Sequence, residues 1–319
     1  MSLSDPTICF AHVAYRLGDE FAARGKPYRA FEVRTLDALH ERIPEADVLV
    51  ISGLWRNELL ERARRLRFIQ SIGAGTDQFP RDLLRQRNIR LASAQGVNER
   101  AVSEHAMALI LALTRQLHFA RDNQARHFWR GMIADPTRRE EELGRKTLLI
   151  VGLGRIGSRL AALARAFGLR VIAVKRHPAP SPVADAVVES DRLGEVLPEA
   201  DIVALTCPLT PETEGLIGAA ELALMKPSAY LVNVARGRVV VEEALIAALR
   251  EGRIAGAGLD CFYEEPLPAS SPFWDFPNVL VTPHSAGETR RYESNVVDVL
   301  LENLDRLSAG ETELMNQVV

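Results

Sequence analysis

Three ionisable side chains, each able to move a proton or bind an anion, follow short apolar runs in the second half of the sequence. Arg236 follows AYLVNV, Asp260 follows AGAGL and His284 follows NVLVTP. Runs of this length and composition are typical of buried strands. Because ligands of an open α/β sheet lie beyond the carboxyl ends of its strands, we expect these side chains to converge there. Asp260 has an alternative role, since a carboxylate at this position can also cap the turn that follows.

Glu265 and His284 form a candidate pair for proton transfer. Glu265 lies in the loop CFYEEPLP, which follows Asp260 and which its two prolines keep extended. A carboxylate beside an imidazole favours the imidazolium form, so Glu265 would raise the pKa of His284 and orient its ring. Protonated His284 can then give its proton to a carbonyl oxygen while Arg236 binds a carboxylate, which is the arrangement that a carbonyl reduction by hydride requires. The alternatives are an exposed loop acid at position 265 and a solvated histidine at position 284.

A nucleotide site is predicted by the stretch TLLIVGLGRIGSRLAALARAFGLRVIAV. Gly152, Gly154 and Gly157 form GxGxxG between a predicted strand and an Ala/Leu-rich helix, with a second strand following. The first glycine makes the tight turn, the second lets the backbone approach a pyrophosphate, and the third lets helix and strand pack closely. Arg155 and Ile156 then lie at the helix N-terminus, whose amides meet the negative charge. The alternative is a glycine-rich turn in another kind of α/β protein.

The end of the second strand carries basic residues where an NAD site usually has an acid. In such units an Asp or Glu about 20 residues beyond the glycines binds the ribose hydroxyls. Here Lys175 occupies that position, and Arg176 and His177 follow it. Cations suit a 2′-phosphate, and an arginine can bind its oxygens in a forked geometry. The sequence therefore favours NADP(H), while surface cations beside an NAD ribose that other residues hold are the alternative.

The order of the predicted elements indicates two domains. The chain has 319 residues, enough for two ordinary cores. Strand-like runs alternate with helical segments over residues 7–93 and again over 146–283, which predicts two parallel sheets, each wrapped by helices on both faces. One long amphipathic helix is expected at about 98–128, with a charged surface loop at 131–146 after it, and a last helix is expected at 289–307.

Composition narrows the class of protein and its surroundings. Hydrophobic residues make up 47% of the chain, and 39 basic side chains stand against 42 acidic ones, so neither nucleic acid nor a membrane is indicated as a partner. The longest apolar run, Ala106 to Leu113, is far shorter than the ~20 residues of a membrane helix. Cys9, Cys207 and Cys261 lie far apart in or beside apolar stretches, which indicates reduced, buried thiols and no metal site. Since the N-terminus also lacks a signal-peptide pattern, we expect a cytoplasmic protein.

Together these motifs resemble the D-isomer-specific 2-hydroxyacid dehydrogenases, which include glyoxylate/hydroxypyruvate reductases, D-lactate dehydrogenases and phosphoglycerate dehydrogenases. The resemblance spans almost the whole chain, and it is carried in order by SIGAGTD, AVSEHAMALILAL, GRKTLLIVGLGRIGSRLA, CPLTPET, NVARGRVVVEEAL, GLDCFYEEPLP and VTPHSAG. It implies that Arg236, Glu265 and His284 form a catalytic trio. Further residues of the cofactor site, beyond the glycine loop and the basic residues after it, are implied to be Cys207, Pro208, Val234, Ala235, Asp260, Ala286 and Gly287.

The same resemblance implies the domain architecture. Residues 1–97 and 289–319 would form a flavodoxin-like substrate domain, and residues 98–288 a Rossmann cofactor domain. The active site would lie in the cleft between them, with the helices at 98–128 and 289–307 as hinges. A homodimer is implied as well.

Substrate contacts are expected from the first domain. The resemblance implies that Gly73, Ala74 and Gly75 offer backbone amides to the substrate carboxylate. Trp55 and Arg56 follow the ADVLVIS strand, so we expect them to face the same cleft, where they would favour a compact polar substrate. The alternative is that both side chains merely pack on the surface of the first domain.

The sequence thus predicts an NADP(H)-dependent reductase of small 2-oxo acids, above all glyoxylate and hydroxypyruvate, with NAD(H) as the second cofactor. Lys175 departs from the acid that many family members carry, and Glu265 argues against formate as the substrate. Two alternatives stay open: an NAD(P)-sensing binding protein similar to the transcriptional corepressors related to this family, and a dehydrogenase of the D-lactate or phosphoglycerate type.

Overall fold

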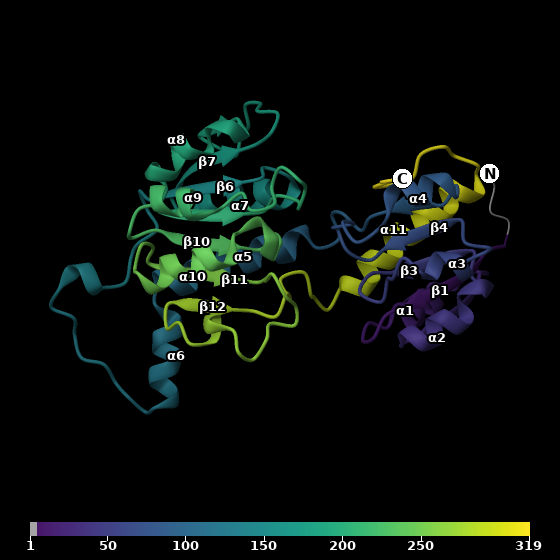
Figure 1. Ribbon diagram of the computed structural model, residues 1–319, viewed down its shortest axis with the longest axis horizontal. Coiled ribbons are helices and arrows are strands. Elements are labelled where there is room, and N and C mark those ends of the chain that lie inside the picture. The colour runs from purple at the N-terminus through teal and green to yellow at the C-terminus, as the bar shows by residue number, and fades with distance from the viewer. Residues whose placement is uncertain (1–4) are drawn as a thin grey trace. The chain divides into compact units, whose positions relative to one another are not determined.

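The chain folds into two compact α/β units, as a computed structural model shows (Figure 1). The structure describes residues 5–319, so the first four residues of the expected 1–97 segment lie outside the described residues. One unit comprises Met1–Asn98 and Glu288–Val319, and the other comprises Glu99–Gly287. These limits differ by one residue at each junction from those that the sequence suggests.

The first unit is built on a five-stranded sheet in the order β2-β1-β3-β4-β5, the flavodoxin-like order. Its strands are β1 (Thr7–Ala11), β2 (Arg29–Val33), β3 (Val48–Ile51), β4 (Phe68–Ser71) and β5 (Arg90–Ala92). Its helices are α1 (Leu17–Ala23), α2 (Leu36–Arg42), α3 (Leu59–Arg62), α4 (Arg81–Gln86) and α11 (Tyr292–Ser308). Side chains alternate across the sheet: Ile8 and Phe10 pack with α1 and α11, whereas Cys9 and Ala11 pack with α2, α3 and α4.

The second unit is built on a seven-stranded sheet in the order β12-β11-β10-β9-β6-β7-β8, a Rossmann order with one added strand. Its strands are β6 (Thr147–Val151), β7 (Arg170–Val174), β8 (Ala186–Val188), β9 (Ile202–Leu205), β10 (Tyr230–Asn233), β11 (Gly256–Leu259) and β12 (Val279–Val281). All strand pairs in both sheets are parallel. The prediction of two doubly wound parallel sheets is therefore confirmed.

Helices cover both faces of the second sheet. They are α5 (Glu99–Thr114), α7 (Arg155–Ala166), α8 (Leu193–Val196), α9 (Ala219–Leu224) and α10 (Glu242–Arg250). The remaining helix, α6 (Leu117–Ala125), follows α5 and has no buried residue. Short 3-10 turns in the two units are η1 (Ile43–Glu45), η2 (Pro136–Arg138), η3 (Ser190–Arg192), η4 (Leu197–Glu199), η5 (Gly237–Val239) and η6 (Pro272–Trp274).

Two elements differ from the sequence-based prediction. The long helix expected at 98–128 is broken into α5 and α6, because Gln116 adopts a left-handed conformation with φ 51°. The carbonyl of Thr114, at the end of α5, accepts a hydrogen bond from the amide of Glu141 (2.9 Å), so the returning loop satisfies the helix end. The short edge strand β8 was not predicted, since its three residues follow a proline-rich stretch with little strand signal.

The C-terminal residues pair with the outer edge of β5. The amide of Val318 donates to the carbonyl of Leu91 at 2.7 Å, and an antiparallel bridge joins Gln317 to Ala92. The fully buried Asn303 of α11 binds both backbone groups of Met315, at 2.7 Å and 3.2 Å. We call residues 314–319 the C-terminal tail, and it is fastened both to the sheet and to the last helix.

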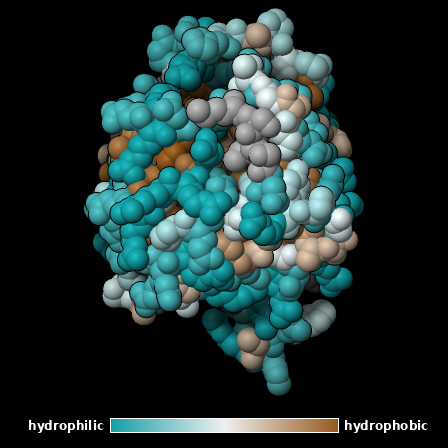
Figure 2. All heavy atoms as spheres, turned by 90° about the vertical axis from the view of Figure 1, so that its right-hand side faces the viewer, coloured by the Kyte–Doolittle hydropathy of each residue, from teal (hydrophilic) through white to brown (hydrophobic). Residues whose placement is uncertain are grey.

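The surface agrees with the composition. Hydrophilic residues cover most of the face that Figure 2 shows. Within the described chain, no helix combines the length and the apolarity needed to cross a membrane. Cys9, Cys207 and Cys261 are buried and unpaired, as expected.

Candidate active site

His284 lies on a turn that the carboxylate of Asp260 organises. The turn follows β12, and His284 adopts a left-handed conformation with φ 53°, which is uncommon for a residue other than glycine. Asp260, only 2% exposed, directly follows β11. Its two oxygens accept hydrogen bonds from the amides of Ser285 and Ala286, at 3.0 Å each, and from the hydroxyl of Thr282 at 2.6 Å. Asp260 therefore caps this turn, whatever further role it has.

Glu265 binds the imidazole of His284. Its Oε2 lies 2.7 Å from Nδ1 of His284, and its Oε1 accepts a hydrogen bond from the amide of Phe262 at 2.9 Å. The hydrogen bond to Glu265 raises the pKa of His284 above its ordinary value, although partial burial and the charge of Arg236 act against it. Burial alone would raise the pKa of Glu265, but its hydrogen bonds with His284 and Phe262 outweigh this and leave the pKa below its usual value. The pair therefore favours imidazolium beside carboxylate.

Arg236 follows β10 on a turn that Asn233 shapes. Asn233, 1% exposed, donates through Nδ2 to the carbonyl of Arg236 (2.9 Å) and accepts from the amide of Ala235 (3.0 Å). Because the charge of Arg236 influences the pKa of both Glu265 and His284, the structure brings all three together at the carboxyl edge of the second sheet. Sequence reasoning missed Asn233, although it lies inside the motif NVARGR.

Gly237 allows the Arg236 turn to pack against the loop of Glu265. A Cβ atom at Gly237 would lie 1.9 Å from the carbonyl carbon of Phe262 and 2.5 Å from the amide of Tyr263. Any side chain there would force the two segments apart. The glycine of the RGR sequence is thus required by a backbone contact inside the candidate site.

The GxGxxG loop has the close contacts and the open side that a phosphate site needs. A Cβ at Gly152 would lie 2.7 Å from the backbone of Cys207, and one at Gly157 would lie 2.2 Å from the carbonyl of Gly152. Gly154 immediately precedes α7, and a Cβ there would meet nothing within 4 Å. The amides of Arg155 and Ile156 open this helix, so the residues present fit a pyrophosphate at its N-terminus.

The other predicted cofactor residues also lie in the second unit. Lys175 follows β7 and its amide donates to the carbonyl of Val188 at 3.0 Å, leaving its side chain exposed beside Arg176. The pKa of Glu212 is lowered first by the hydroxyl of Thr210 and also by Arg176, which places Arg176 near the loop CPLTPET. The remaining predicted positions follow strand ends of the same sheet: Cys207 and Pro208 after β9, Val234 and Ala235 after β10, and Ala286 and Gly287 after β12.

Cys207 is not a candidate nucleophile. Burial raises the pKa of its thiol to about 11, so the thiol stays protonated near neutral pH. Among residues 5–319, no three His, Cys, Asp or Glu side chains are grouped to hold a metal.

The predicted substrate loop follows β4 in the first unit. The hydroxyl of Tyr292 donates to the carbonyl of Ile72 at 2.6 Å, and the hydroxyl of Ser71 bonds both backbone groups of Gly73 at 3.2 Å. The amides of Ala74 and Gly75 have no hydrogen-bond acceptor within the described chain. Two backbone donors are thus available on a loop whose preceding residues are firmly held.

Trp55 packs in the core of the first unit. It is 4% exposed, packs on Phe79 with ring centroids 4.9 Å apart, and donates from Nε1 to Asn57 at 3.0 Å. Arg56 is exposed and donates to the carbonyls of Gly53 (3.1 Å) and Trp55 (2.7 Å).

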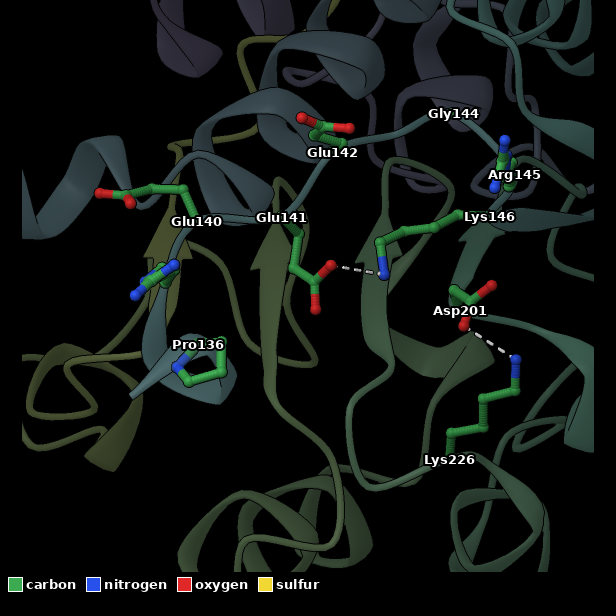
Figure 3. A pocket seen from close by; sticks show the side chains of 10 residues that line it. Pro136, Glu140, Glu141, Glu142, Gly144, Arg145, Lys146, Asp201 and Lys226 are labelled. Carbon is green, nitrogen blue, oxygen red and sulfur yellow. Dashed lines mark hydrogen bonds and ion pairs between the residues drawn. The ribbon is translucent and has the colours of Figure 1, made fainter. Parts of the chain in front are cut away.

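A pocket lies at the amino-terminal edge of the second sheet, opposite the edge that carries the candidate active site (Figure 3). Lys146 precedes β6 and pairs with Glu141 at 2.8 Å, while Lys226 pairs with Asp201 at 2.8 Å. The remaining lining residues are Pro136, Arg139, Glu140, Glu142, Gly144 and Arg145. Four basic and four acidic side chains offset one another here, so the pocket lacks the excess charge of an ion site.

Comparisons with known proteins agree with this geometry. The family model described as "D-isomer specific 2-hydroxyacid dehydrogenase, NAD binding domain" matches residues 107–286. A glyoxylate reductase from Aeropyrum pernix is 37% identical over 294 residues, which cover 89% of this chain and 87% of the relative. A D-3-phosphoglycerate dehydrogenase from Mycobacterium leprae is 36% identical over 287 residues; the match covers 88% of this chain but 53% of the relative, so the chain spans about half its length.

A solved structure is similar over the whole chain. The NADPH-dependent glyoxylate/hydroxypyruvate reductase from Sinorhizobium meliloti, determined in complex with NADP and malonate, has a TM-score of 0.84 and 25% sequence identity. The similarity covers 99% of this chain and 97% of that one. With a family model across most of the second unit and relatives aligned along nearly the full length, the chain belongs to the family of D-isomer-specific 2-hydroxyacid dehydrogenases.

Proposed function

We propose that the chain reduces small 2-oxo acids, with glyoxylate and hydroxypyruvate preferred, to D-2-hydroxy acids with NADPH. The observation that carries this proposal is the contact of 2.7 Å between Glu265 and His284, beside Arg236 and on the sheet edge that also carries the glycine loop. A charged imidazole that a carboxylate holds in place is suited to protonate a carbonyl oxygen at neutral pH.

The protein side chains divide the work of this reaction. Nδ1 of His284 is engaged by Glu265, so Nε2 is the atom left to donate its proton to the carbonyl oxygen. The guanidinium of Arg236 binds the substrate carboxylate in a forked geometry and draws electron density from the carbonyl. A bound nicotinamide supplies the hydride to the carbonyl carbon. In the reverse direction, neutral His284 accepts the proton of the hydroxyl group.

Cofactor selection is assigned to the residues after β7. We propose that the loop from Gly152 to Gly157 holds the pyrophosphate and that Lys175 and Arg176 bind the 2′-phosphate. The absence of an acid at Lys175 and the bound NADP in the Sinorhizobium meliloti relative support NADP(H), with NAD(H) as the weaker cofactor. The second unit then acts as the cofactor domain and the first as the substrate domain.

Substrate choice rests on the first unit and on the relatives. The unpaired amides of Ala74 and Gly75 suit a carboxylate, and the exposed Arg56 of the same unit is a candidate for a polar group of the substrate. The Aeropyrum pernix relative is a glyoxylate reductase. Phosphoglycerate dehydrogenase activity is the second candidate, favoured by the Mycobacterium leprae relative but weakened because this chain spans about half of that protein.

We propose a homodimer formed through α6 and the segment after it. Figure 1 shows this part extending away from the sheet of its own unit. Trp129 and Met132 are 96% and 102% exposed, and Phe119 and Phe128 line the same groove of about 930 Å³. Large apolar side chains exposed together are unfavourable in water and suit an isologous contact with a second copy.

We propose that the protein is located in the cytoplasm. Its three buried, unpaired thiols favour a reducing compartment.

The activity is tested with a substrate panel. We would measure kcat/KM with NADPH for glyoxylate, hydroxypyruvate, pyruvate, phenylpyruvate and 3-phosphohydroxypyruvate, with His284→Ala as the inactive control. Glyoxylate and hydroxypyruvate should lead, and hydroxypyruvate should give the D-hydroxy acid. A preference for phenylpyruvate contradicts the compact substrate. A preference for 3-phosphohydroxypyruvate supports the second candidate, and NADPH binding without any turnover supports a corepressor-like sensor instead.

A further inference from the structure

His105 of α5 is linked to the His284 turn by hydrogen bonds. Nε2 of His105 lies 3.0 Å from the hydroxyl oxygen of Thr282, and this hydroxyl donates to Oδ1 of Asp260 at 2.6 Å. Asp260 in turn binds the amides of Ser285 and Ala286. The motif SEHA contributes no residue to the proposed proton transfer. Through Thr282 and Asp260, its His105 is connected to the residues that precede and follow His284.

The direction of this chain of hydrogen bonds follows from the number of protons. A hydroxyl has one proton, and that of Thr282 is given to Asp260, so its oxygen must accept from His105. His105 therefore carries a proton on Nε2. Its Nε2 is 3.6 Å from Oδ1 of Asp260, too long for a hydrogen bond, so its effect on Asp260 passes through Thr282.

We propose that His105 is a positioning residue: by fixing the Thr282 hydroxyl on Asp260, it holds the turn that presents His284 to the substrate. This inference rests on the proposed role of His284 as the proton donor. The left-handed conformation of His284 is costly for a side-chain-bearing residue and persists only where the surroundings fix it. Asp260 supplies that constraint by accepting three hydrogen bonds, and without His105 the Thr282 hydroxyl loses the second contact that orients it.

The positioning also has an electrostatic consequence. The charged groups that act on His284 are Glu265, Arg236 and Asp260. The contact with Glu265 depends on where the turn holds the ring, and the influence of Asp260 depends on where its carboxylate is held. Removing His105 should therefore change the pH profile of the reaction as well as its rate.

The test compares His105→Leu, which removes the donor, with His105→Gln, whose side-chain amide can replace it. We expect about fivefold lower kcat in the leucine variant, the effect of one lost hydrogen bond, with KM and NADPH affinity within about twofold of wild type. The fall of the reduction rate at high pH should begin at lower pH. The glutamine variant should recover both properties, and His40→Leu, in the first unit, should resemble wild type.

A double-mutant cycle shows whether His105 acts through Thr282. If it does, His105→Leu combined with Thr282→Val should be no slower than Thr282→Val alone. The proposal would be overturned if the losses of kcat in the two single variants multiplied in the double variant. It would also be overturned if His105→Gln were no more active than His105→Leu, or if His105→Leu had the kcat and pH profile of the wild type. If His105→Leu does not fold, Thr282→Ser is compared with Thr282→Val instead. The serine variant keeps the hydroxyl and should retain the kcat of the wild type, whereas the valine variant should be slower.

A measurement without turnover separates this proposal from the proposed function. Nitrogen-15 spectra of labelled histidine, assigned by the signal missing in His105→Gln, should show His105 protonated on Nε2 at neutral pH. Protonation on Nδ1 alone would overturn the positioning role whatever the enzyme does. Full activity in His284→Ala would instead overturn the proposed function and leave the tautomer of His105 unaffected.

Discussion

Glu265 binds His284 with one carboxylate oxygen and the amide of Phe262 with the other, at 2.7 Å and 2.9 Å. The amide fixes the carboxylate to the backbone, so the imidazole is held by a rigid acceptor rather than by a free surface acid. The ring is thereby oriented with Nδ1 toward Glu265 and Nε2 away from it. This arrangement gives the proposed proton donor one defined orientation before the substrate binds.

The first prediction concerns pH. Reduction needs protonated His284, and its raised pKa extends the range in which that form dominates. The reduction rate should therefore stay high at low pH and fall as pH rises through the raised pKa, whereas oxidation should rise over the same interval. In Glu265→Gln the fall should begin at lower pH, because the negative charge that helps to raise the pKa of His284 is lost and a neutral amide is a weaker acceptor. Rate profiles of wild type, Glu265→Gln and the neighbouring Glu264→Gln check this, and an unchanged limb in Glu265→Gln contradicts it.

Arg236→Lys should lose substrate recognition although the charge is kept. A lysine is a point charge and cannot reproduce the forked contact of a guanidinium with a carboxylate. We expect kcat/KM for glyoxylate to fall by at least about tenfold, or ~1.4 kcal/mol. Arg238→Lys, two residues away, is the matched control and should stay near wild type. Equal values for both variants would remove Arg236 from the site.

Cofactor preference should follow the residues after β7. With Lys175, Arg176 and no acid at this strand end, kcat/KM should be at least about tenfold higher with NADPH than with NADH. The variant Lys175→Asp with Arg176→Ala should shift the ratio toward NADH, since an acid binds ribose hydroxyls and repels a phosphate. Arg192→Ala, an exposed cation elsewhere in the unit, should leave the ratio unchanged. A wild-type preference for NADH would contradict the assignment.

Gly237→Ala should disrupt the site through a backbone contact. Its Cβ would lie 1.9 Å from the carbonyl carbon of Phe262, so the Arg236 turn and the Glu265 loop must separate. Overpacking of this kind costs about 1–3 kcal/mol of stability. We expect a lower Tm together with a loss of turnover larger than the stability change explains. Gly144→Ala, where a Cβ meets nothing within 4 Å, should alter neither.

The proposed dimer is tested by charge on its apolar surface. Trp129→Glu with Met132→Glu should give a monomer by light scattering on a sizing column, because two buried carboxylates oppose the contact. Trp274→Glu, which charges another exposed tryptophan, should leave the mass unchanged. A monomeric wild-type protein, or a double variant that stays dimeric, would exclude this surface as the interface.

Much of the fold follows from local sequence patterns. Alternating apolar runs and helical segments predicted every strand of residues 5–319 except β8, and the parallel arrangement, since each buried strand carries its own signal. The glycine loop could also be predicted, because the three glycines lie in a strand, turn and helix that are consecutive in the sequence, although Gly152 also packs on the distant Cys207. Arg236, Asp260 and His284 were predicted to converge because the strand-end rule places them on one edge, and Glu265 was inferred from its place in the loop after Asp260.

The rest depends on contacts between distant segments. The residues around Thr114 give no indication that the amide of Glu141 will bind the Thr114 carbonyl at the end of α5. The packing of Trp55 on Phe79 could not be predicted, because the two rings come from separate segments of the chain. His105 and Thr282 are unremarkable in their own segments, and their link becomes visible only when α5 and β12 lie together.

The C-terminal tail covers backbone groups at one edge of the first sheet. An unpaired edge strand offers a row of amides and carbonyls to any extended chain nearby. Here Val318 and Gln317 occupy that row on β5, and Asn303 ties the tail to α11. Clipping of the tail by a protease would open the edge while most of the core stays intact. The tail thus occupies backbone groups of β5 that an extended chain could otherwise bind.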